Sequence, residues 1–273
     1  MVGQKKILED LKNLKESNNF PRFIILSGVK GSGRKTVSRY ISKLLNGYLI
    51  ECELGVDSVR EAVHNCYKCS VPTVYQFADA DKMSLAAKNA LLKITEEPPR
   101  QAYFVITVQM AENMLETLRS RAMCVQMAPY TEDELYEFVQ SEGITLKDDR
   151  ILDVSDVPGQ VLAFNSIDFE DMWDYCSLII DNVKTVTGVN AFKIVNKVKI
   201  KEDKEGYDSE LFFQCLRSIL RRRIMEGFEE NLPEMTTWAN MLKVTSKYHR
   251  EFNLTGVKKD STLDMWILEM RNT

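Results

Sequence analysis

The sequence predicts an α/β domain with a parallel sheet, followed by a region that is entirely helical. Two observations support this prediction. Short apolar segments with strand character alternate with amphipathic helical segments as far as about residue 128, and the apolar residues beyond Pro129 have helical spacing. The chain has 273 residues, enough for two or three domains. We expect domains at 1–128, 129–165 and 166–273.

Each predicted element has its own local signal. The segment 4–15 places apolar residues at helical spacing, and Phe23–Leu26 is continuously apolar, as is typical of a strand buried on both faces. Thr131 and Glu134 have the spacing of a capping box. The predicted strands are 23–26, 48–52, 74–78, 103–108 and 123–127, the predicted helices up to residue 140 are 4–15, 36–45, 56–64, 85–95, 111–118 and 131–140, and the later helical region has expected breaks near 158–159, 188, 201–208 and 233.

The formal net charge of −4 is spread evenly: residues 1–165 carry 20 basic and 22 acidic side chains, and residues 166–273 carry 16 and 18. A protein that grips DNA alone needs a basic surface, so we expect any contact with DNA to be local and shared with other subunits. No stretch approaches 18 uncharged apolar residues, and no signal-type apolar run follows the first residues. These features argue against a membrane span and favour a cytoplasmic location.

A glycine-rich segment, Gly28-Val-Lys-Gly31-Ser-Gly33-Arg34-Lys35-Thr36, lies between a predicted strand and a predicted helix. This is the context of a phosphate-binding loop, in which backbone N–H groups and the helix N-terminus face the anion. The usual pattern has Lys after the last glycine and then Ser or Thr, where this chain has Arg34 and Lys35. Arg34 can still pair with a phosphate, but Lys35 has no hydroxyl for Mg²⁺. A one-residue shift to Lys35 and Thr36 would restore both groups and would require a bulge at the helix start. The other interpretation is a structural loop, empty or holding ADP.

The third predicted strand ends without the paired acids of a hydrolysing site. Ala78 stands at the metal-binding position, and the shorter Asp79 stands where a longer acid would polarise water. The alternative role for Asp79 and Asp81 is to cap the next helix.

Six cysteines include one close pair, Cys66 and Cys69. Together with Cys52 and His64, this pair permits a zinc site with three Cys and one His, although structural zinc sites usually draw on two such pairs. We therefore predict free thiols in a reducing compartment and no metal site.

Four motifs carry a resemblance to a known family. The segments 78–83 (Ala-Asp-Ala-Asp-Lys-Met), 89–93 (Asn-Ala-Leu-Leu-Lys), 96–99 (Glu-Glu-Pro-Pro) and 119–121 (Arg-Ser-Arg) resemble the clamp-loader branch of AAA+ proteins, in particular its delta-prime type of subunit. The likeness is specific over about 20–128, weaker to 165, and weakest beyond 166. It implies a P-loop-type α/β domain, a small helical lid and a helical collar that holds an oligomer together.

The resemblance also implies roles for particular residues. Arg121, preceded by Ser120, would act in trans on ATP held by an adjacent ATPase subunit, with Ala122 replacing the family's cysteine. Leu162 replaces the lid arginine that touches the γ-phosphate in cis. Ser84 and Lys88 begin a helix of the kind that tracks the DNA backbone in this family, and simple capping by Ser84 is the alternative.

Three positions needed for hydrolysis in cis are thus altered, at Arg34 and Lys35, at Ala78 and Asp79, and at Leu162. We predict a subunit that does not hydrolyse ATP, whether or not ATP or ADP is bound. Its expected partners are clamp-loader ATPase subunits, the sliding clamp and, through the assembled complex, primer–template DNA. The alternatives are an ATP-hydrolysing subunit that uses the shifted loop, and an AAA+-like adaptor outside replication.

Overall fold

The computed structural model describes residues 2–203, 209–252 and 257–273. The chain forms two compact units, one made of Met1–Phe138 with Val157–Gln160 and the other of Val139–Asp156 with Val161–Thr273. The division into three domains at 128 and 166 stays a prediction.

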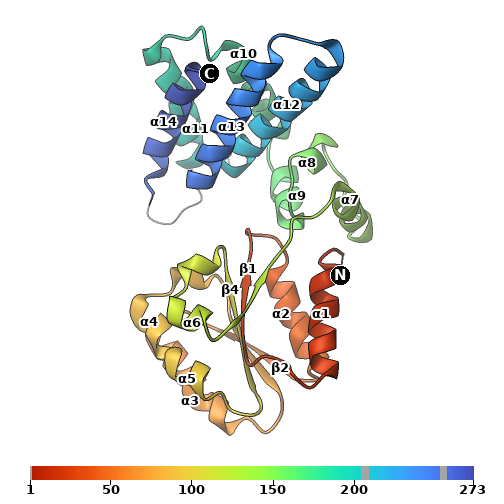
Figure 1. Ribbon diagram of the computed structural model, residues 1–273, viewed down its shortest axis with the longest axis vertical. Helices are drawn as coiled ribbons and strands as arrows, with labels where there is room; N and C mark the ends of the chain where they lie inside the picture. The colour runs from red at the N-terminus through yellow and green to blue at the C-terminus, as the bar shows by residue number, and fades with distance from the viewer. Residues whose placement is uncertain (1, 204–208, 253–256) are drawn as a thin grey trace. The chain divides into compact units, whose positions relative to one another are not determined.

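The first unit is built on a parallel five-stranded sheet with the strand order β2-β3-β4-β1-β5 (Figure 1). The three central strands are completely buried, whereas both edge strands are partly exposed. The predicted parallel α/β fold is therefore confirmed, with strand bounds that differ from the prediction by one residue or less. The strands are β1 (Phe23–Ser27), β2 (Tyr48–Cys52), β3 (Thr73–Phe77), β4 (Ala102–Val108) and β5 (Met123–Gln126).

Helices cover both faces of this sheet (Figure 1). On one face, α1 (Lys5–Glu16) and α2 (Arg34–Leu44) bury Leu11, Val37 and Ile41 against β1, β3 and β4. The helices of the opposite face bury a second apolar cluster that includes Val59, Ala87 and Leu118. Those helices are α3 (Val56–Asn65), α4 (Leu85–Ala90), α5 (Leu92–Glu96) and α6 (Glu116–Arg119).

Two predicted helices are interrupted. The helix expected at 85–95 is divided at Leu91, whose N–H bonds the Lys88 carbonyl three residues back instead of four. The helix expected at 111–118 is a 3₁₀ turn (Ala111–Asn113) followed by α6, with extended backbone at Met114 between them. Asn113 donates its side-chain N–H to Asp81 at 2.6 Å. This tertiary bond fixes the chain where local spacing favoured a helix.

Beyond β5, the regular elements in the described residues are all helices, joined by loops and turns. Thr131 and Glu134 exchange side-chain bonds with each other's backbone N–H at 3.2 and 3.1 Å, as the capping-box prediction requires. The break expected at 201–208 lies largely outside the described residues. The helices are α7 (Glu132–Ser141), α8 (Arg150–Asp153), α9 (Pro158–Asn165), α10 (Phe169–Asn182), α11 (Gly188–Asp203), α12 (Ser209–Glu230), α13 (Met235–Phe252) and α14 (Lys259–Arg271).

The core of the second unit is aromatic. The ring of Phe212 meets that of Trp266 edge-on at 5.2 Å between centroids, and Phe213 stacks on His249 at 5.1 Å. Trp173 lies between two guanidinium groups, those of Arg150 at 4.9 Å and Arg222 at 5.5 Å. Trp173 and Trp266 are both buried and thus contribute to the packing of this unit. Within the described ranges, no helix combines the length and apolar character needed to cross a membrane.

Candidate functional site

The glycine loop connects β1 to α2. Gly31 and Gly33 have φ angles of +89° and +88°, which side chains with a Cβ rarely adopt, and Gly33 directly precedes the helix. Ser32 between them is buried, and its hydroxyl has no protein partner among the described residues. The loop and the start of α2 therefore have the shape of a phosphate-binding loop.

Arg34 is turned inward at the first position of α2. Its side chain is only 5% exposed, and its Nη2 atom lies 3.1 Å from Oδ1 of Asp79, which follows β3. Burial lowers the pKa of Arg34, while the nearby carboxylates of Asp79 and Asp81 oppose this shift. The cation that replaces the usual lysine is thus neutralised by an acid of its own chain.

Neither acid uses its side chain to cap a helix, although Asp79 immediately precedes the 3₁₀ turn Ala80–Lys82. Asp79 has a φ of +54°, its N–H donates to Thr107 Oγ1 at 3.0 Å, and its carboxylate accepts from Arg34. Asp81 accepts from the N–H of Gln109 at 2.9 Å and from Asn113. The capping alternative for these two acids was therefore wrong, because both carboxylates bond residues distant in sequence.

Lys35 and Thr36 are both exposed. The first turn of α2 is regular: the Val37 N–H donates to the Gly33 carbonyl at 2.9 Å. In the shifted-loop alternative the helix start would have to bulge and both side chains would have to turn into the loop.

The start of α9 packs directly on the glycine loop, and both belong to the first unit. The Gly159 N–H donates to the Gly31 carbonyl at 3.2 Å, and a Cβ added at Gly159 would lie 2.3 Å from the Gly31 Cα. Only glycine permits this approach of two backbones. Leu162, at the position of the family's lid arginine, is half exposed on α9.

These residues do not fit a magnesium-bound nucleotide. Mg²⁺ prefers oxygen ligands, and the chain offers neither a hydroxyl directly after Arg34 nor a carboxylate at Ala78. Among the residues that the structure describes, the Ser32 hydroxyl in the loop and Nη1 of Arg34 at the start of α2 are buried donors without a protein partner. The loop thus keeps groups that can hold a phosphate without a metal ion.

Arg121 lies just beyond α6, two residues before β5. Its side chain is 39% exposed, its Nη2 lies 3.2 Å from Glu96 Oε1, and its Nη1 donates to the Thr117 carbonyl at 2.9 Å. Glu96 is the last residue of α5, so two helices fix the guanidinium. Ser120 is exposed and donates its hydroxyl to the same Thr117 carbonyl at 3.2 Å.

The sheet separates Arg121 from the glycine loop of its own chain. β1 and β5 run parallel with Ile24 opposite Met123 and Ser27 opposite Gln126. Arg121 precedes the first of these pairs and the loop follows the last. At about 3.3 Å per residue, the paired segment alone accounts for roughly 10 Å. Arg121 and the chain's own phosphate loop therefore lie at opposite ends of this strand pair.

Comparisons with known proteins show which proteins this chain is similar to. A family model described as "DNA polymerase III, delta subunit" matches residues 51–131. The DNA polymerase III subunit delta' of Escherichia coli is 35% identical over 36% of this chain and 30% of its own length. These matches support a relationship of this chain to the AAA+ clamp-loader family.

Other relatives are less similar to this chain in sequence. The DNA polymerase III subunit gamma of Buchnera aphidicola subsp. Schizaphis graminum is 25% identical over 51% of this chain and 47% of its own length. A mutant of RuvB from Thermotoga maritima shares the fold, with a TM-score of 0.51 and 18% identity over 63% of this chain and 64% of the solved chain. The chain aligns with about half or less of the length of these curated relatives.

The side chains of Ser84 and Lys88 both form hydrogen bonds within the chain. The Ser84 hydroxyl accepts from the Ala87 N–H at 3.2 Å and caps α4. Nζ of Lys88 donates to the Asn113 carbonyl at 2.6 Å. Ser84 therefore caps α4, as the alternative interpretation predicted, and DNA contact by either residue stays a prediction.

The cysteine cluster forms no ligand set. Cys69 Sγ lies 3.2 Å from the Tyr75 hydroxyl, and Cys66 bonds the Val63 carbonyl. Burial raises the pKa of Cys66 to about 11 and that of Cys52 to about 12, which favours neutral thiols. In the portion covered by the structure, no group of three or more His, Cys, Asp or Glu side chains could hold a metal ion.

Sequence reasoning missed two parts of the site. The motif 96–99 does not by itself indicate that Glu96 is the carboxylate that binds Arg121. The only sequence feature that could have drawn attention to Glu96 is its position in the motif Glu96-Glu97-Pro98-Pro99. The backbone contact between Gly31 and Gly159 has no local signal in the sequence, because the two glycines are 128 positions apart.

Proposed function

We propose that this chain is a non-hydrolysing, delta-prime-like subunit of a DNA polymerase clamp loader, which provides Arg121 in trans to ATP bound by a neighbouring ATPase subunit during sliding-clamp loading. The observation that carries the proposal is the contrast between two arginines at opposite ends of one sheet. Arg34 is buried and paired inside the chain's own loop, whereas Arg121 is partly exposed at the far end.

The altered loop supports the absence of hydrolysis. Hydrolysis of a nucleoside triphosphate by P-loop proteins needs a metal ion and a cationic side chain that stabilise the charge on the β- and γ-phosphates. In this chain Arg34 is held by Asp79, and the metal-binding positions lack oxygen ligands. Bound nucleotide would serve structure and not turnover.

The environment of Arg121 supports a role in trans. Its partner Glu96 is 59% exposed, and exposed ion pairs contribute about 0–1 kcal/mol. Exchange of Glu96 for a phosphate of a neighbouring subunit therefore costs little, while the contact with Thr117 keeps the guanidinium positioned. An arginine supplied in trans is worth on the order of 10³–10⁵ in the rate of phosphoryl transfer.

The proposed partners follow from this role. They are the ATPase subunits of the same complex, the sliding clamp that the complex opens, and primer–template DNA held by the assembled complex. The even charge of the chain is consistent with DNA contact shared among subunits.

The test is DNA-stimulated ATP turnover by the reconstituted complex with Arg121→Ala. We expect a fall on the order of 10³-fold at the site served by this arginine. Arg100→Ala is the matched control, because Arg100 is also exposed in the same unit and lies outside the site described above. Equal turnover by the two variant complexes would refute the trans role.

A further inference from the structure

A second feature lies beside Arg121, at the free edge of β5. The sheet ends at this strand, which pairs only with β1 within the described residues. The Met127 N–H donates to the Ser27 carbonyl at 2.7 Å, toward β1. Backbone groups alternate along a strand, so the N–H and C=O groups of Cys124 and Gln126 face outward. An unpaired edge of this kind is a template for another strand.

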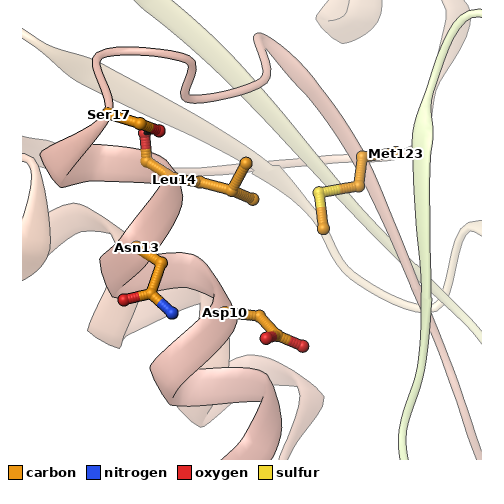
Figure 2. Close-up of a pocket in the computed structure, with 5 residues that line it drawn as sticks. All are labelled: Asp10, Asn13, Leu14, Ser17 and Met123. Atoms are coloured by element: carbon orange, nitrogen blue, oxygen red, sulfur yellow. Dashed lines mark hydrogen bonds between the residues drawn. The ribbon is translucent and has the colours of Figure 1, made fainter.

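The outward edge borders a groove between β5 and α1. The groove has a volume of about 480 Å³ and is lined by Asp10, Asn13, Leu14 and Ser17 of α1 and by Met123 of β5 (Figure 2). Figure 2 shows the side chains of Leu14 and Met123 directed toward each other, with Asp10 and Asn13 on the α1 side. An extended segment added to β5 would therefore place side chains in this groove.

The lining selects a particular kind of segment. The Asp10 carboxylate and the Asn13 amide are exposed and have no side-chain partner in the described part of the chain. A carboxylate without an internal cation favours a Lys or Arg side chain, and Leu14 with Met123 can cover the methylene stem of either. The open edge favours extended backbone.

The groove also lies close to Arg121. Met123 is two residues from Arg121, a separation of at most about 7 Å between Cα atoms. Any subunit that presents ATP to Arg121 thus comes within one or two residues of the groove. Asp10 then supplies charge complementarity to a basic segment of that same subunit.

We infer that the groove between α1 and β5 is the docking site for an extended, basic segment of the neighbouring ATPase subunit, added as a strand to β5. This inference rests on the proposed function, because the identity of the partner comes from the position of Arg121. In this arrangement the Asp10 carboxylate would bind a Lys or Arg side chain of the incoming segment. The backbone N–H and C=O groups of Cys124 and Gln126 would form the hydrogen bonds to its backbone.

The charge is tested by Asp10→Lys against Glu9→Lys. Both residues are exposed on α1 and carry the same charge, but only Asp10 lines the groove. The probe is the clamp-loader ATPase subunit of the same organism, with affinity measured by biolayer interferometry at two salt concentrations. We expect Asp10→Lys to weaken binding about tenfold or more, and Glu9→Lys to bind like the wild-type chain. Equal affinities for the two variants would overturn the inference.

The added strand is tested by Cys124→Pro against Cys124→Ala. Proline removes the outward N–H, whereas alanine keeps it, and thermal melts establish that both variants fold. We expect only the proline variant to lose affinity, and unchanged binding of a folded Cys124→Pro chain would contradict strand addition.

ATP turnover separates this inference from the proposed function. The defect of Asp10→Lys should be reversed when the concentration of the variant chain is raised, because docking is weakened. The defect of Arg121→Ala should persist at any concentration. If Arg121→Ala retains full turnover, the proposed function fails. If Asp10→Lys and Glu9→Lys require the same concentration, the docking groove fails.

Discussion

The two ends of the parallel sheet hold an arginine in different ways. Arg34 and Asp79 lie 3.1 Å apart, and Arg121 and Glu96 lie 3.2 Å apart, so the two ion pairs have nearly the same geometry. Their burial differs: the Arg34 side chain is 5% exposed and that of Arg121 is 39% exposed. A buried cation depends on its carboxylate, whereas an exposed one is stabilised by water. The same pairing therefore fixes one arginine and leaves the other free to exchange partners.

The largest predicted effect on stability follows from removing the carboxylate that pairs with the buried Arg34. Asp79→Asn leaves this cation without its carboxylate, and because the Asp79 side chain is itself 38% exposed, we expect the free energy of unfolding to fall by about 2–4 kcal/mol. Asparagine tolerates the φ of +54° at this position, so the backbone is not a competing cause. Urea unfolding followed by far-UV circular dichroism measures the change. Tryptophan fluorescence would not report on the unit that contains Asp79, because Trp173, Trp238 and Trp266 all lie in the second unit.

A second prediction concerns the contact that closes the glycine loop. In Gly159→Ala the added Cβ would lie 2.3 Å from the Gly31 Cα, a backbone atom that cannot turn aside. We expect a loss of about 1–3 kcal/mol in unfolding free energy, measured by urea titration. Gly55→Ala is the control, because its Cβ would meet no atom within 4 Å. Similar losses in both variants would mean that α9 does not pack on the loop as described.

These two sites show which features the sequence could predict. The strands were found within a residue because their apolar runs are local, and the capping box was found because Thr131 and Glu134 are three residues apart. The pair of Arg34 with Asp79 joins residues 45 positions apart, so the loop pattern alone suggested a phosphate ligand. The helix expected at 111–118 failed for a similar reason, because Asp81 binds Asn113 across the fold.

A smaller effect is expected at the start of α7. Thr131→Ala removes the hydroxyl that accepts the Glu134 N–H, at a cost of about 1 kcal/mol. Thr131→Ser keeps the hydroxyl and should remain within a few tenths of the wild-type value. Thermal melts of the two variants measure the difference, and equal losses would exclude a capping role.

The exposed pair gives the smallest change in stability. Glu96→Gln should alter the free energy of unfolding by less than about 1 kcal/mol, because water solvates Arg121 when its partner is lost. The comparison with Asp79→Asn in the same urea titration is the informative one. If Glu96→Gln were as destabilising as Asp79→Asn, the distinction between a fixed and an exchangeable arginine would be wrong.

The raised pKa values of the buried thiols predict that the free energy of unfolding falls with pH in the alkaline range and not at neutral pH. The pKa of Cys66 is raised to about 11, so the folded state holds its proton more tightly than the unfolded state does. Its contribution to stability is complete below the unfolded pKa of about 8.5 and is lost as pH rises toward 11. Cys66→Ala should flatten this decline when unfolding is measured from about pH 8 to about pH 11, and an unchanged slope would contradict it.

The central claim is that this chain stimulates ATP turnover by a neighbouring subunit and does not hydrolyse nucleotide at its own glycine loop. DNA-stimulated turnover by reconstituted complexes tests it most directly when either arginine is replaced, with Arg34→Met in one complex and Arg121→Ala in the other. The account predicts a large loss with Arg121→Ala and wild-type turnover with Arg34→Met. A large loss with Arg34→Met and none with Arg121→Ala would contradict it.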